Sequence, residues 1–122
     1  MLPEGGRRDP VIVAALVDRP LRAEEAGVVS ATCHIGPSDY GMTLTAAIEM
    51  PALAGPEDMV IEAGDPAIWV SEPEMQRQGD VLTGSVVMAH VSGEGFALDR
   101  SAVRITILGR DLAVDIQGCA AG

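Results

Sequence analysis

The stretch VRITILGRDLAVDI, residues 103–116, decides the fold class of this 122-residue chain. Apolar side chains alternate with polar or small ones on both sides of residues 109–111, and a period of two places them on opposite faces of a strand. Glycine followed by two charged residues between such runs is typical of a tight turn. The sequence therefore predicts an antiparallel hairpin here.

The same alternation recurs upstream. Val28–Ile35 and Met42–Ile48 flank a Gly- and Pro-containing turn and predict a second hairpin. Further strands are expected at residues 59–63 and 67–71, at 81–91 with Gly84 as a potential break, and at 96–98 after the turn 92–95, while residues 72–79 look like a surface excursion. Many short strands separated by glycine and proline predict an all-β, mainly antiparallel barrel or sandwich.

The N-terminal part is expected to differ. Residues 1–10 contain Pro3, Gly5, Gly6 and Pro10 and predict a flexible segment, after which residues 11–122 form a single β domain. Val11–Val17 is apolar and β-branched, which favours a strand over a buried helical turn. The charged residues that follow this run argue against a secretory signal, and the run is too short to span a bilayer.

Charge and aromatic content exclude whole classes of partner. The net charge is −10, and the chain has one Trp, one Tyr and one Phe. Duplex binders need a positive face for the phosphates, and single-strand binders stack bases on aromatic side chains. The composition therefore predicts no nucleic-acid polymer and no membrane insertion.

The two cysteines, Cys33 and Cys119, have neither the spacing of a zinc site nor that of a redox motif. We expect free thiols in a cytoplasmic protein, because a disulfide would need an oxidising compartment.

Residues able to carry chemistry are few. His34 and His90 fall in predicted strands without metal-ligand spacing, and Ser38 beside Asp39 lacks the surroundings of a nucleophile elbow. Acidic pairs lie in loops, where a solvated face is the ordinary explanation. The sequence predicts no enzyme, no metal and no cofactor, and a catalytic site would require a pocket that brings the two histidines together with carboxylates.

Two stretches resemble PilZ domains. In residues 27–44 a strand leads into Gly36-Pro37-Ser38-Asp39-Tyr40-Gly41 and a second apolar strand follows, similar to the [D/N]-x-S-x-x-G hairpin of that family. Ser38 and Gly41 match the pattern, while Gly36 replaces its Asp or Asn. Residues 79–98 are similar to the closing strand pair. The resemblance implies a six- to eight-stranded barrel with residues 103–116 as an added C-terminal hairpin.

Many PilZ domains bind cyclic di-GMP through an R-x-x-x-R segment before the serine turn. Arg7 and Arg8 stand near that place, but Val11 and Ile12 stand where the second arginine belongs. The ligand-binding candidates are therefore Arg7, Arg8, Ser38 and Gly41. Because half of the motif is missing, the resemblance implies weak or no binding of cyclic di-GMP.

The resulting hypothesis is a non-catalytic PilZ-like adaptor in bacterial regulation that works through a protein partner. The alternative is a structural or assembly subunit that forms a homo-oligomer or binds a partner through its strand edges. For that alternative the final hairpin is the expected edge.

Overall fold

The computed structural model describes residues 20–39 and 41–122. Its strands and short 3-10 helices are β1 (Leu21–Arg22), η2 (Glu24–Ala26), β2 (Ser30–Ser38), β3 (Gly41–Glu49), β4 (Asp58–Glu62), β5 (Ile68–Val70), β6 (Glu74–Gln78), β7 (Val81–His90), η3 (Arg100–Ala102), β8 (Arg104–Leu108), β9 (Ala113–Gln117) and β10 (Ala120–Ala121). The expected flexible segment 1–10, the expected strand 11–17, Arg7 and Arg8 lie outside the described residues.

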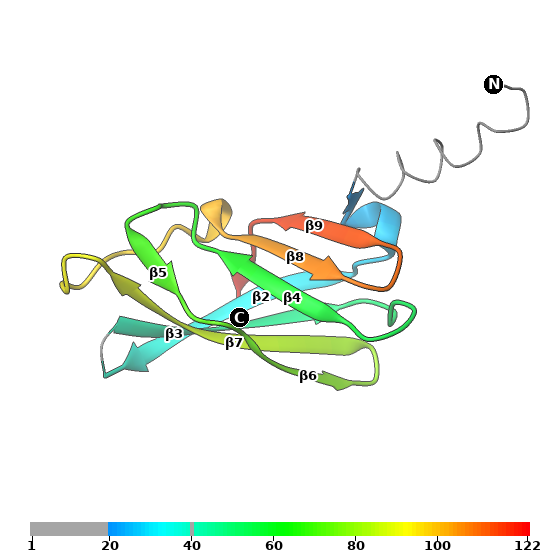
Figure 1. Cartoon of the computed structure of the whole chain (residues 1–122), viewed down its shortest axis with the longest axis horizontal. Helices are drawn as coiled ribbons and strands as arrows, with labels where there is room; N and C mark the ends of the chain where they lie inside the picture. Colours follow the sequence, from blue (N-terminus) through cyan, green and yellow to red (C-terminus); the bar gives the residue numbers. More distant parts are fainter. Residues whose placement is uncertain (1–19, 40) are drawn as a thin grey trace, which may run out of the picture.

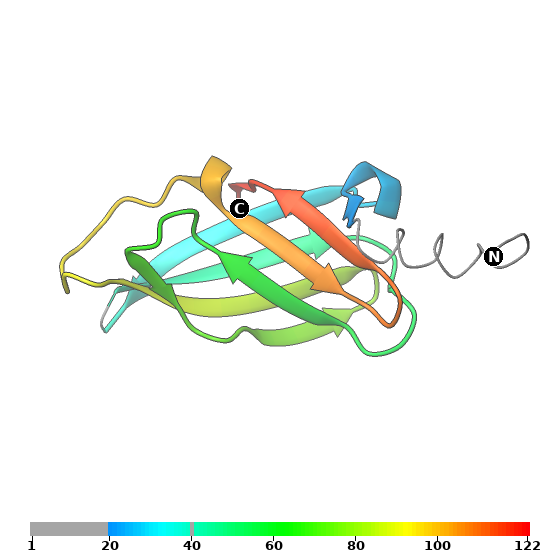
Figure 2. The ribbon, with the colours of Figure 1, turned by 45° about the horizontal axis from the view of Figure 1, so that its top comes forward.

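The strands form two sheets that face one another (Figure 1). Sheet A has the order β1-β9-β8-β4, and sheet B has the order β10-β2-β3-β7-β5, with β6 also paired to β7. In Figure 2 the strands β4, β8 and β9 of sheet A cross in front of strands of sheet B. The all-β class is confirmed. Closure into a barrel is not confirmed, because both sheets end in edge strands within the described part of the chain.

Both hairpins with clear alternation are present. β2 pairs with β3 and β8 pairs with β9, each antiparallel. In β3 the residues Leu44, Ala46 and Ile48 are fully buried, which is the face that alternation predicts. The final hairpin is not an edge, however. β8 and β9 are the inner strands of sheet A, between β1 and β4.

Three other expectations fail. Residues 72–79 are not an excursion, since β6 pairs with β7. The stretch 96–98 forms no strand. β7 runs unbroken through Gly84, where an added Cβ would clash with the Met59 sulfur from the facing sheet. The glycine therefore makes room for core packing rather than breaking the strand.

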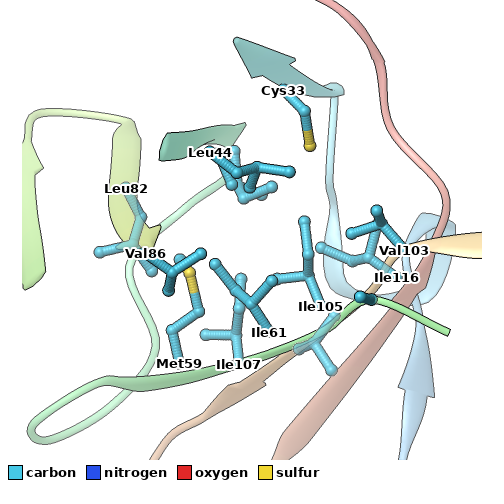
Figure 3. Packing of buried hydrophobic residues seen from close by; sticks show 14 of the residues in the cluster. Cys33, Leu44, Met59, Ile61, Leu82, Val86, Val103, Ile105, Ile107 and Ile116 are labelled. Carbon is cyan, nitrogen blue, oxygen red and sulfur yellow. The ribbon is translucent and has the colours of Figure 1, made fainter. Parts of the chain in front are cut away.

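The core lies between the sheets and is aliphatic (Figure 3). Sheet A contributes Ile105, Ile107 and Val114, and sheet B contributes Leu44 and Val86, all less than 3% exposed. No charged or polar residue is buried among the described residues. Among them there is also no helix long and apolar enough to cross a membrane.

Candidate binding groove and disulfide

The serine turn chosen from sequence lies at one end of sheet B. Ser38 ends β2 and pairs with Gly41 at the start of β3. A Cβ at Gly41 would clash with the main-chain oxygen of Met88 in β7, so this glycine is explained by the close approach of two strands. The Ser38 hydroxyl oxygen is buried without a hydrogen bond among the described residues. Its role in ligand binding stays a prediction.

The two histidines are not brought together. His34 is exposed and opposes Thr45, which opposes Ser85 of β7. His90 lies five residues beyond Ser85 along β7, which at the rise of a strand is roughly 16 Å from Ser85. Its Nδ1 accepts the main-chain N–H of Ser92 at 3.1 Å and lies 2.8 Å from the Ser92 hydroxyl. No group of metal-binding side chains is found in the described residues.

A hollow lies between the edge strands β4 and β5, at the open side between the sheets. Its volume is about 710 Å³. We call it the β4–β5 groove, and its lining consists of Ile61, Glu62, Ala63, Gly64, Asp65, Pro66, Ile68, Trp69, Val70, Val91, Ala102, Arg104 and Gln117. Most of the lining side chains are apolar; the lining contains no His, Cys or Ser, and its ionisable side chains are Glu62, Asp65 and Arg104. The groove is therefore suited to binding.

Two exposed apolar residues lie at this groove. Trp69 is 58% exposed and Val91 is 73% exposed. Trp69 opposes Ala89 in β7, so Val91, two residues beyond Ala89, is its diagonal neighbour. Tryptophan is enriched at binding hot spots, so Trp69 with the neighbouring Val91 offers an apolar surface suited to an interface.

The sequence carries one local signal at this site. Ile68, Trp69 and Val70 are consecutive apolar residues in a short strand. In a strand that covers a core on one face, the middle residue points outward and is ordinarily polar. An apolar residue there indicates a face that binds something.

Charges at the groove are mainly negative. Glu62 and Asp65 are exposed carboxylates of its lining. Arg104 is engaged elsewhere, because its Nε and Nη2 donate to the Asp115 carboxylate at 2.7 and 2.8 Å. This hydrogen-bonded carboxylate raises the pKa of Arg104. The groove therefore favours a basic partner over an acidic one.

The other end of the same open side is closed. Arg77 of β6 donates from Nε and Nη2 to Glu57 at 2.6 and 2.8 Å, just before β4 begins. Its Nη1 donates to the carbonyls of Met50 and Gly79. The two side chains are only 19% and 10% exposed, and the hydrogen bonds from Arg77 lower the pKa of Glu57. This ion pair joins sheet B to sheet A.

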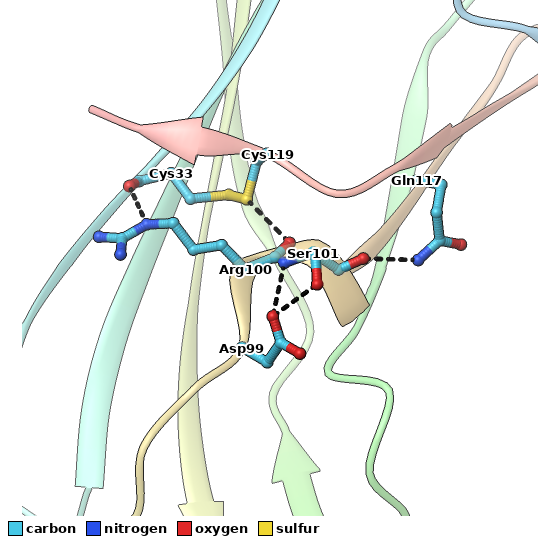
Figure 4. The surroundings of a disulfide bond; sticks show 6 residues. All are labelled: Cys33, Asp99, Arg100, Ser101, Gln117 and Cys119. Carbon is cyan, nitrogen blue, oxygen red and sulfur yellow. Dashed lines mark hydrogen bonds between the residues drawn. A yellow bond between two sulfur atoms is a disulfide. The ribbon is translucent and has the colours of Figure 1, made fainter.

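Cys33 and Cys119 form a disulfide (Figure 4). Cys33 lies in the buried face of β2, and Cys119 follows β9 where the chain crosses to sheet B and continues as β10. Arg100 of η3 completes the junction, since its Nε donates to the Cys33 carbonyl and its carbonyl accepts the Cys119 N–H. The bond joins segments 86 positions apart.

The expected free thiols and the expected cytoplasmic location are therefore wrong. Disulfides persist in oxidising compartments and are reduced in the cytosol. Sequence spacing missed the pairing because the two cysteines meet only through the crossover from sheet A to sheet B, a contact that local patterns do not encode.

Comparison with protein-family models and with curated proteins finds no match. Among solved structures, the fold is similar to the N-terminal periplasmic domain of ScsB from Proteus mirabilis, with a TM-score of 0.67 and 10% sequence identity. The match covers 96% of this chain and 46% of that chain, so this chain spans about half the length of its structural neighbour. At this identity the likeness concerns the fold.

This neighbour and the disulfide together correct the functional hypothesis. A cytoplasmic PilZ-like signalling adaptor does not fit a disulfide-bonded chain that shares its fold with a periplasmic domain. The sequence resemblance to PilZ domains itself stays untested.

Proposed function

We propose that this chain is a non-catalytic extracytoplasmic β-sandwich domain that binds a partner protein through the β4–β5 groove. The observation that carries the proposal is Trp69, the one tryptophan of the chain, which is 58% exposed at the rim of an apolar groove. Tryptophan is the residue most enriched at binding hot spots.

The extracytoplasmic location is supported by the Cys33–Cys119 bond and by the periplasmic setting of the structural neighbour. The absence of catalysis is supported by the groove's lining, which offers neither a nucleophile paired with a base nor a set of metal ligands among the described residues. A protein partner is favoured because the groove is open and two exposed apolar side chains, Trp69 and Val91, lie at it, as in the apolar centre of a protein interface.

The test is selection of nine-residue peptides from a random display library on the full, oxidised chain. The tightest peptide is expected to blue-shift the tryptophan fluorescence, which reports on Trp69 alone. Trp69→Ala is expected to weaken binding at least about tenfold in calorimetry, as hot-spot truncations do. The matched control is Leu112→Ala, which removes another exposed apolar side chain, 42% exposed, in the turn after β8.

A library that yields no binder contradicts the proposal. Binders that leave Trp69 fluorescence unchanged and tolerate Trp69→Ala contradict it as well, because they would dock on another face.

A further inference from the structure

The groove-facing edge of β5 carries main-chain groups without partners. Val91 N–H donates to the Ala67 carbonyl and Ser71 N–H donates to the Val87 carbonyl, so the odd-numbered residues 67, 69 and 71 face β7. The groups of Ile68 and Val70 consequently face the other way. The Ile68 N–H donates to the Asp65 carbonyl. The Ile68 carbonyl and both main-chain groups of Val70 remain unpaired among the described residues.

These groups are accessible, because Ile68 and Val70 are only half-buried and both line the β4–β5 groove. An unpaired N–H and two unpaired carbonyls on one strand edge match the hydrogen-bonding pattern of another extended backbone.

We infer that the partner contributes an extended segment that adds as a further strand to the free edge of β5. The inference rests on the proposed function and names the form of its partner. Alternate side chains of the added segment would enter the groove, and the other set would lie toward the face that carries Trp69. The added segment extends sheet B over the groove.

The charges at the groove restrict the composition of the partner segment. Glu62 and Asp65 flank the groove, Arg104 is held by Asp115, and the whole chain carries a net charge of −10. The incoming segment is therefore apolar at its centre with lysine or arginine at an end, from another protein rather than from an acidic second copy of this chain.

The test is an N-methyl scan of the tightest library peptide on the unmodified, oxidised protein. Methylation at every second residue, on the set of N–H groups that pairs with β5, is expected to weaken binding more than tenfold. Methylation of the intervening residues leaves the pairing N–H groups intact and is expected to change binding less than about threefold. This period of two is the signature of strand addition.

A protein variant tests the same edge from the other side. Val70→Pro removes a main-chain N–H that does not pair with β7, so the β5–β7 ladder keeps its hydrogen bonds. Peptide affinity should fall at least tenfold, with the urea midpoint serving as the folding control. Because the N-methyl scan uses unaltered protein, it decides the question even where this variant folds poorly.

The outcomes separate the two proposals. Binding that depends on Trp69 but shows no period of two in the scan overturns strand addition and leaves the binding domain standing. A synthetic peptide of residues 7–19 that binds as tightly as the selected peptide overturns the assignment to another protein.

Replacing the basic residues of the selected library peptide with glutamine is expected to weaken its binding about threefold in wild type and less in Glu62→Gln. Equal losses in the two proteins overturn the charge assignment.

Discussion

β5 and β6 lie one after the other along the same side of β7, yet they differ as sheet edges (Figure 1). β6 shows Glu74, Gln76 and Gln78 to solvent, and Arg77 fastens it to Glu57 ahead of β4. β5 shows a tryptophan to solvent, and the side between it and β4 is hollow. One half of this edge is polar and closed, and the other half is apolar and open.

Soluble proteins blunt their sheet edges with charge, because an unprotected edge pairs with other chains. The chain applies this protection at β6 and omits it a few residues earlier. Omission next to an example of the protection points to a use for the open half, and binding is the use that an apolar edge supports. The contribution of each closed edge to the free energy of unfolding can be measured with variants.

The strongest closure is expected at the opposite edge of sheet B, where the disulfide holds β10 against β2. The double variant Cys33→Ala/Cys119→Ala should lower the free energy of unfolding by about 4 to 5 kcal/mol, because the bond spans 86 positions and restricts the unfolded chain. Urea titration measures this loss. Added phosphine reductant should destabilise wild type and leave the double variant unchanged, and a wild-type midpoint that does not move on reduction contradicts the prediction.

The next largest effect is expected at the closed half of the β5–β6 edge. Arg77→Met leaves the nearly buried Glu57 carboxylate without its cation, and the expected loss of stability is about 2 to 3 kcal/mol in urea titration. Adding Glu57→Leu should restore most of it, since the charge that lacks a partner is then gone.

Arg104→Met is the matched control for Arg77→Met. Arg104 also binds its carboxylate through two hydrogen bonds, but its side chain is 49% exposed. Because this pair is solvated, its removal should cost clearly less stability than the removal of Arg77. Equal losses for the two arginines would show that Arg77 does not fasten the edge more firmly than a surface pair.

The features that sequence predicted correctly are those set by the alternation of apolar and polar residues along a strand. The hairpins β2–β3 and β8–β9 and the buried face of β3 follow from local patterns, because each side chain's direction is fixed by its place in the strand. Gly41 was chosen from sequence as a ligand-binding candidate by its match to a family motif, which stays a prediction, and the structure adds a packing reason for this glycine. The close approach of Met88 that requires a glycine there comes from a strand far along the chain.

What failed depends on pairing between distant segments. β4 and β5 look like neighbours in sequence, yet β4 pairs with β8 in one sheet and β5 with β7 in the other. The β4–β5 groove exists because these successive strands belong to different sheets, and the local pattern at Ile68–Val70 marks only an outward apolar residue, not the groove itself. The disulfide follows from a similar change of sheet, between β9 and β10.

The smallest expected effect is a loss of stability at acid pH, which tests the same closed edge without removing a side chain. The pKa of Glu57 is lowered in the folded chain by hydrogen bonds from Arg77, from an ordinary value of 4.5. The ionised carboxylate therefore stabilises the fold fully above pH 4.5, and this contribution is lost as the pH falls through the lower pKa of the folded state.

Wild type should accordingly lose more stability than Glu57→Gln between neutral pH and pH 3 in urea titrations. The difference should be smaller than the cost of Arg77→Met, because a protonated Glu57 is neutral and the charged Arg77 keeps its bonds to the Met50 and Gly79 carbonyls. Glu74→Gln removes an exposed carboxylate from β6 and controls for the general effect of acid. If Glu57→Gln and wild type follow parallel curves, the charge on Glu57 does not hold this half of the edge, and the contrast with β5 would rest on packing and solvent exposure alone.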